Sequence, residues 1–162
     1  MSLALSIRGA GMHHSSVRPM LARPVTPNSE HADRNAALVA RQYLGHGGIV
    51  GSDEFSARVR AHINQPISQV ARWIVAREVV QFWWGGETQF PLFQFDLTRM
   101  TLRPEVRRVV AELADAFDDL EVAEWFVRPN PMLSQALPVE VLREDAEEVF
   151  AAARAYRFVV LG

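Results

Sequence analysis

Apolar residues recur at helical spacing along most of the chain. Intervals of three and four residues predict longer helices over residues 31–44, 53–63, 66–78 and 104–117. The same spacing predicts shorter helices over 120–127, 138–143 and 145–157, followed by an apolar tail over 158–162. Glycines and prolines separate these stretches, as expected for helix ends. The pattern therefore predicts a mainly α-helical protein.

The period changes to that of a strand between residues 79 and 95. Val79–Trp84 is rich in strand-forming residues, Gly85-Gly86-Glu87 is a turn signal, and a second apolar run follows over 88–95. This arrangement predicts a β-hairpin. Pro91 lies in the second strand, which suggests an edge strand or a bulge because proline donates no ladder hydrogen bond.

The pattern also predicts how the chain is divided. Residues 1–30 hold three prolines and no lasting periodicity, which predicts a flexible leader. The rest divides into a helix-turn-helix-like region with its hairpin over 31–96 and a small helical bundle over 97–162. No apolar run approaches the roughly 18 residues that a membrane span needs. With no signal-peptide pattern and no cysteine, we expect a cytoplasmic protein that binds no membrane.

Charge is distributed unevenly between the two halves. Residues 1–95 carry nine arginines and six acidic residues, whereas residues 96–162 carry eight arginines and thirteen acidic residues. The basic first part and acidic second part suggest different partners, although solvated surfaces also produce such splits. Lysine is absent, so every basic side chain is an arginine, which suits bidentate interface contacts.

Five common catalytic signatures are missing from the sequence. It contains no GxSxG, GxxxxGK[ST], HExxH, CxxC or GxGxxG motif, and its histidines lack metal-ligand spacing. The cluster of Asp118, Asp119, Glu121 and Glu124 is typical of a solvated helix end. We therefore predict a protein that is not an enzyme, with no catalytic residue, metal or cofactor.

Two short helices joined by a tight turn and followed by a hairpin are typical of a winged or MerR-like helix-turn-helix. In this interpretation 66–78 is the recognition helix, with Ile67, Val70, Ile74 and Trp73 pointing inward. The candidate contacts to bases or phosphates are Ser68, Gln69, Arg72, Arg58, Arg60 and Arg77. The alternative is a pair of ordinary packed helices, because the positive charge is small for a stand-alone DNA-binding domain.

A second pattern lies further along the chain. It runs Trp125, Pro129-Asn130, Leu133, Pro138, Val141-Leu142 and an acidic helix from Asp145, and it is preceded by the segment FPLFQFD at 90–96. In order and spacing, residues 120–157 resemble the toxin-binding domain of the Xre/MbcA/ParS-like antitoxins, with a looser likeness from residue 52. The family usually has small residues, often glycine, where this chain has Ser134-Gln135-Ala136. Since glutamine enters left-handed conformations less freely than glycine, we expect a different backbone shape at that turn.

The resemblance implies a binding function. It implies a cognate toxin, usually a RES-domain protein that degrades NAD, which the antitoxin neutralises by covering or plugging its active site. It also implies a dimer and an N-terminal domain that binds the operon's own promoter DNA. The candidate partner-binding residues are Pro129, Asn130, Pro131, Met132, Leu133, Arg154, Arg157 and the tail from Phe158. Trp125 is expected in the core, and packing of the tail onto the last helix is the alternative.

Three functions remain open at this point. The leading hypothesis is an antitoxin that binds a toxin and autoregulates its operon. The alternatives are a DNA-binding transcriptional regulator without a toxin, and a scaffold or assembly protein that reuses the antitoxin fold.

Overall fold

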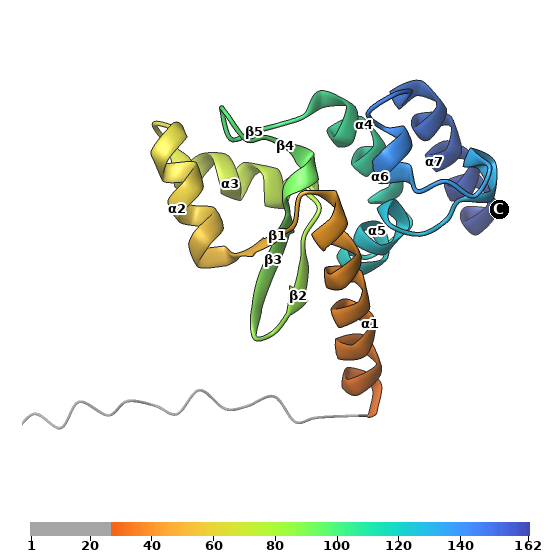
Figure 1. Cartoon of the computed structure of the whole chain (residues 1–162), viewed down its shortest axis with the longest axis horizontal. Coiled ribbons are helices and arrows are strands. Elements are labelled where there is room, and N and C mark those ends of the chain that lie inside the picture. The colour runs from red at the N-terminus through yellow and green to blue at the C-terminus, as the bar shows by residue number, and fades with distance from the viewer. Residues whose placement is uncertain (1–26) are drawn as a thin grey trace, which may run out of the picture.

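The computed structural model describes residues 27–162 and shows a mainly helical chain with a small antiparallel sheet (Figure 1). The helices are α1 (Pro27–Tyr43), α2 (Ser52–His62), α3 (Pro66–Val75), α4 (Pro104–Leu113), α5 (Asp119–Phe126), α6 (Pro138–Val141) and α7 (Ala146–Leu161). The strands are β1 (Ile49–Gly51), β2 (Phe82–Trp84), β3 (Glu87–Pro91), β4 (Phe95–Asp96) and β5 (Thr101–Leu102). Short 3-10 helices occur at η1 (Leu44–His46), η2 (Leu92–Gln94) and η3 (Pro131–Leu133).

The predicted hairpin is part of a larger sheet. Strands β2 and β3 pair as expected, but β1 adds a third strand, so that the order is β1-β3-β2. The expectation that Pro91 marks an edge strand or a bulge is wrong, because β3 is the central strand. Pro91 is its last residue, where the ladder ends and the next N–H, that of Leu92, donates to Gly48 at 2.9 Å.

Several element boundaries differ from the predicted ones. Residues 27–30, predicted as leader, already belong to α1, because proline is well tolerated in a first helical turn. Helix α3 ends at Val75, since Arg77 adopts a left-handed φ of 50°. The predicted tail is the last turn of α7, which continues to Leu161. The rest of the predicted leader, residues 1–26, lies outside the described residues.

The sheet separates two groups of helices (Figure 1). On one face, Val50 and Phe90 pack with Phe55 of α2 and Trp73 of α3. On the other face, Phe82 packs with residues of α1, α4, α5 and α7. Consecutive strand residues point to opposite faces, and Phe82 pairs with Gln89 next to Phe90, so the two clusters occupy opposite sides. Residue 96 therefore does not separate the residues of one hydrophobic cluster from those of the other, because α1 shares its core with the C-terminal helices.

The segment from Phe90 to Asp96 forms the wall between these clusters. Phe90, Leu92 and Phe95 enter the cluster of α2 and α3, whereas Phe93 enters the other. Gln94 is fully buried between the two clusters. Its side-chain amide makes hydrogen bonds to backbone groups, as a neighbouring strand would in a sheet. Its Oε1 accepts from the N–H of Val80 at 2.7 Å, and its Nε2 donates to the carbonyls of Val80 and Pro91, both at 2.8 Å.

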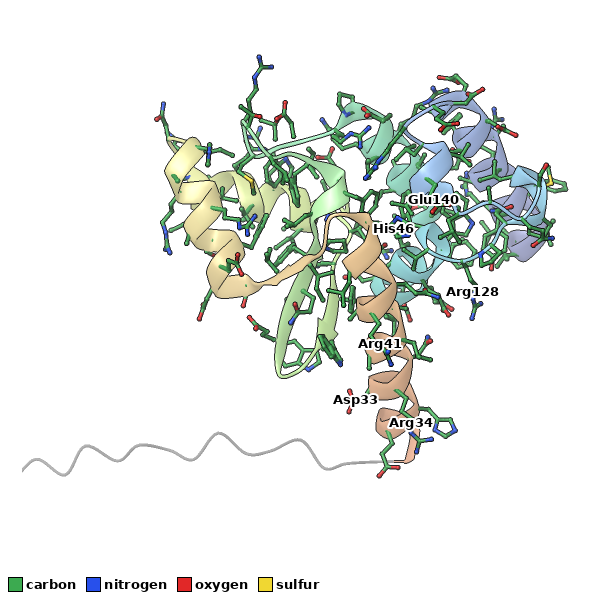
Figure 2. The ribbon with its side chains drawn as sticks, viewed as in Figure 1. Asp33, Arg34, Arg41, His46, Arg128 and Glu140 are labelled. Atoms are coloured by element: carbon green, nitrogen blue, oxygen red, sulfur yellow. The ribbon has the colours of Figure 1, made fainter. Side chains whose placement is uncertain are left out.

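Tyr43 joins α1 to the C-terminal helices. Its ring is fully buried and stacks on Phe82 and Phe93, and its hydroxyl donates to the carbonyl of Ala123 in α5 at 2.6 Å. Burial raises the pKa of the Tyr43 phenol well above 10. A second link lies nearby, where His46 of η1 faces Glu140 of α6 at 4.0 Å (Figure 2).

We predict that Gln94→Leu destabilises the fold by about 3 kcal/mol or more in urea unfolding, because it leaves three buried backbone groups without partners. Gln89→Leu is the matched control. Gln89 is also buried but makes one hydrogen bond, to the carbonyl of Trp84 at 3.1 Å, so its replacement should cost about 1 kcal/mol. Equal losses of unfolding free energy in the two variants would contradict the role assigned to the three hydrogen bonds of the Gln94 amide.

We also predict a loss of stability at alkaline pH. Because the folded-state pKa of Tyr43 exceeds its unfolded value, the stabilisation is complete below about pH 10 and is lost as the pH rises toward the folded pKa. The sequence has two tyrosines, no lysine and no cysteine, so few other groups titrate in this window. Tyr43→Phe should lower the unfolding free energy at pH 7 by about 1 kcal/mol and flatten its fall between pH 10 and 12. An unchanged alkaline slope in this variant would contradict the assignment.

Candidate partner-binding groove

A groove of about 290 Å³ lies where α5, the loop after it and α7 meet. Helix α5 and its end contribute Glu121, Glu124, Trp125 and Arg128, and the loop contributes residues 129–132. Helix α7 contributes Ala155, Tyr156 and Val159, and Phe117 closes one side. The groove thus joins the predicted Pro-Asn-Pro-Met element to a helix about 25 residues further along the chain.

The loop is held in shape by its own backbone. The Asn130 side chain accepts from the N–H of Met132 at 2.9 Å, and the Asn130 carbonyl accepts from Leu133 and Gln135 at 3.0 and 2.9 Å. The N–H of Asn130 donates to Ala136 at 3.1 Å, which closes the loop on itself. Such a loop loses little conformational freedom when it binds another molecule.

These contacts divide the predicted partner-binding residues into two groups. Pro129, Pro131 and Met132 are exposed, and Met132 keeps 62% of its surface accessible. Leu133 is buried in the core, and Asn130 is buried while it caps η3. The prediction that Leu133 contacts a partner is therefore wrong for this structure, because the 3-10 turn points consecutive residues in different directions.

The turn after Leu133 places two residues in a conformation that is unusual for them. Ser134 and Gln135 both adopt left-handed backbone conformations, with φ of 55° and 68°. The expected difference in backbone shape from the family's turn stays a prediction. Left-handed conformations cost non-glycine residues roughly 1–2 kcal/mol each, and the hydrogen bonds that close the loop offset this strain.

Trp125 forms part of the groove wall as well as the core. As expected, it is buried, with 6% of its surface exposed. Its indole N–H has no hydrogen-bond acceptor among the described residues. Beside it, Glu124 pairs with Arg128 at 2.5 Å, and Arg128 projects from the outer surface of the C-terminal helices (Figure 2). The groove is therefore apolar inside, with a charged pair at its rim.

The end of α7 presents a continuous apolar surface beside the groove. Phe158, Val159, Val160 and Leu161 are all exposed, and all four belong to α7 although they were expected in a tail after the last helix. Arg154 is exposed and lies near the ring of Phe150. Arg157 pairs with Glu112 of α4 at 3.1 Å and with Asp115, just after α4, at 3.7 Å, so it links α7 to this segment within the chain. Its predicted role as a contact to an anionic partner stays a prediction.

The predicted DNA contacts lie on α2 and α3. Ser68 and Arg72 are exposed on α3, and Arg72 donates to the side chain of Gln69 at 2.7 Å. On α2, Arg60 is exposed, whereas Arg58 pairs with Glu54 at 2.6 Å.

Two expectations for this region are wrong. Arg77 donates to the carbonyls of Ala114 and Phe117, so it binds the end of α4 instead of a phosphate. Ile67 and Ile74 do not point inward, because Ile67 is 81% exposed and Ile74 is partly so. Trp73 enters the core and Val70 packs against it, as expected.

Sequence reasoning missed Tyr156 on the α7 side of the groove. It falls in the predicted helix 145–157, and in the structure it is partly exposed and lines the groove with Val159 of the predicted tail. One available signal was the absence of a glycine or proline between Arg157 and Leu161, which favours continuation of the helix.

No protein-family model, curated protein or solved structure matches the chain. Within residues 27–162, no helix combines the length and the apolar character needed to cross a bilayer. In the same part of the chain, no three side chains of His, Asp or Glu gather as a metal site would require.

Proposed function

We propose that the chain is an antitoxin-type binding protein and that the groove between α5, the loop 129–132 and α7 docks a cognate toxin. One observation carries this proposal. The loop that contains Pro129-Asn130, a part of the pattern that resembles the antitoxin domain, lines an apolar groove and exposes Pro129, Pro131 and Met132 at its rim.

The physical properties of the groove suit protein binding. Exposed apolar side chains that gather around a pocket are typical of interaction sites, and Met132, Tyr156 and Val159 line the same groove. Methionine adapts its shape to a partner, whereas the closed loop beneath it is rigid. The adjoining turn Phe158–Leu161 extends the apolar surface to the end of α7.

The identity of the toxin is proposed from the resemblance. A RES-domain protein that degrades NAD is the partner it implies, and we propose that the apolar end of α7 covers or plugs the toxin's active site. Both proteins would then meet in the cytoplasm, where NAD is the toxin's substrate.

Co-expression with the product of a neighbouring gene tests the proposal. The wild-type chain should restore growth and cellular NAD, whereas Met132→Asp should weaken binding at least tenfold, because a charge replaces an apolar contact. Leu97→Asp is the matched control, since Leu97 is a similarly exposed apolar residue outside the groove. The proposal fails if no neighbouring product is bound, or if both variants bind equally well.

A second candidate function is DNA binding through α2 and α3. The element order α1-β1-α2-α3-β2-β3 and the sheet order β1-β3-β2 support a winged helix-turn-helix. Three residues separate α2 from α3, which is a suitable length for the tight turn of such a motif. Helix α1 departs from a compact three-helix arrangement, since it packs against β2 and α5.

A titration with the chain's own upstream duplex tests this candidate. If α3 reads DNA, Arg72→Ala should lower the affinity about tenfold at low salt, because one guanidinium contact is lost. Arg143→Ala, which removes an exposed arginine between α6 and α7, is the control. Equal affinities of wild type and Arg72→Ala would remove α3 from any DNA contact.

A further inference from the structure

Helix α3 exposes an apolar face that the proposed toxin-binding groove does not use. A second groove of about 270 Å³ runs between α2 and α3, where Val59, Pro66, Ile67, Val70, Ala71 and Ile74 form its walls. Ile67 is 81% exposed, and the neighbouring Val75 is 84% exposed. In Figure 1, α2 and α3 lie at the opposite side of the molecule from α7.

The spacing of these residues matches a helix that packs against another chain segment. Ile67, Val70 or Ala71, and Ile74 follow one another at intervals of three and four residues, which places them in one row on α3. A helix that reads DNA contacts the bases and phosphates with polar side chains. The apolar groups that its aliphatic side chains can contact in the major groove are the thymine methyls. The row therefore favours a protein partner over DNA.

Charge indicates what kind of protein segment fits. Residues 55–77 contain four arginines and no acidic residue. Two of these arginines are already engaged, since Arg58 pairs with Glu54 and Arg77 binds the end of α4. Arg60 lines the groove itself and is exposed, and Arg72 lies exposed on α3. A carboxylate on the partner would meet Arg60 at the edge of the apolar surface.

A second copy of the chain fits this surface less well. Two copies related by a two-fold axis would bring the same patch together, so Arg60 and Arg72 would face arginines of the partner. One exposed face of a ten-residue helix also offers much less than the roughly 800 Å² per partner that a stable dimer buries.

We propose that the groove between α2 and α3 docks an amphipathic segment of another protein, whose apolar residues at helical spacing fill the groove and whose carboxylate pairs with Arg60. This docking site is separate from the groove at α7 and extends the function beyond toxin binding. Helix-in-groove recognition of this kind uses anchors at i, i+3 or i+4, and i+7.

Selection of peptides on the full chain tests the proposal. A phage library of random 16-residue peptides should yield sequences with a net negative charge and apolar residues at helical spacing. Binding of these peptides should weaken about tenfold in Ile67→Ser, which removes an exposed anchor without disturbing the core. Arg60→Glu should weaken binding similarly and should favour peptides in which the acidic residues are changed to lysine.

Two controls separate this site from other surfaces. Leu38→Ser removes an exposed apolar residue of α1, and Met132→Asp alters the α7 groove, so both should leave peptide affinity unchanged. A selection that returns no peptide dependent on Ile67 overturns the proposal. So does duplex DNA that displaces the selected peptides and binds Ile67→Ser as tightly as wild type, because the face would then be a DNA-binding surface.

Discussion

The buried amide of Gln94 is the contact on which the arrangement of the two helical groups depends. It lies in a segment whose neighbours, Phe93 and Phe95, enter different hydrophobic clusters. Its three hydrogen bonds fix the position of Val80 relative to Pro91 between the two clusters. A buried polar group is stable only when its partners are present, so the amide admits one arrangement of the segments and excludes slipped ones.

Arginine side chains form a second set of contacts, which join α4 and its end to other segments of the chain. Arg77 binds carbonyl groups at the end of α4, and Arg107 of α4 pairs with Glu78, close to Arg77 in the chain. Arg157 joins α7 to α4 in the same manner. Because the guanidinium carries several donors in a planar fork, it binds carbonyls and carboxylates simultaneously. Of the arginines proposed as nucleic-acid contacts, Arg77 therefore links two parts of the chain itself.

The two candidate docking surfaces lie on rigid supports at opposite sides of the sheet. The groove at α7 rests on a closed loop with two left-handed residues, Ser134 and Gln135, whose strain is offset by the loop's hydrogen bonds. The groove at α3 rests on Trp73 and Val59, which are buried in the cluster behind it. Rigid apolar surfaces reduce the ordering cost of binding, which suits a protein whose proposed role is to hold partners.

The sequence by itself determined the features that depend on neighbouring residues. The apolar spacing of Val106, Val109 and Leu113 places α4, and the capping box of Asp118 and Glu121 begins α5. The exposed part of the groove, around Met132, was also predictable from its Pro-Asn-Pro context.

Tertiary structure alone decided the features whose partners lie far along the chain. Strand β1 has three residues and exists because β3, about 40 residues away, supplies its hydrogen bonds. Tyr156 joins Met132 in one groove only after α7 packs beside α5, and Ile67 stays exposed because α2 and the sheet accept Trp73 instead. Spacing along a helix shows which residues share a face, but the packing of distant segments decides which face is covered.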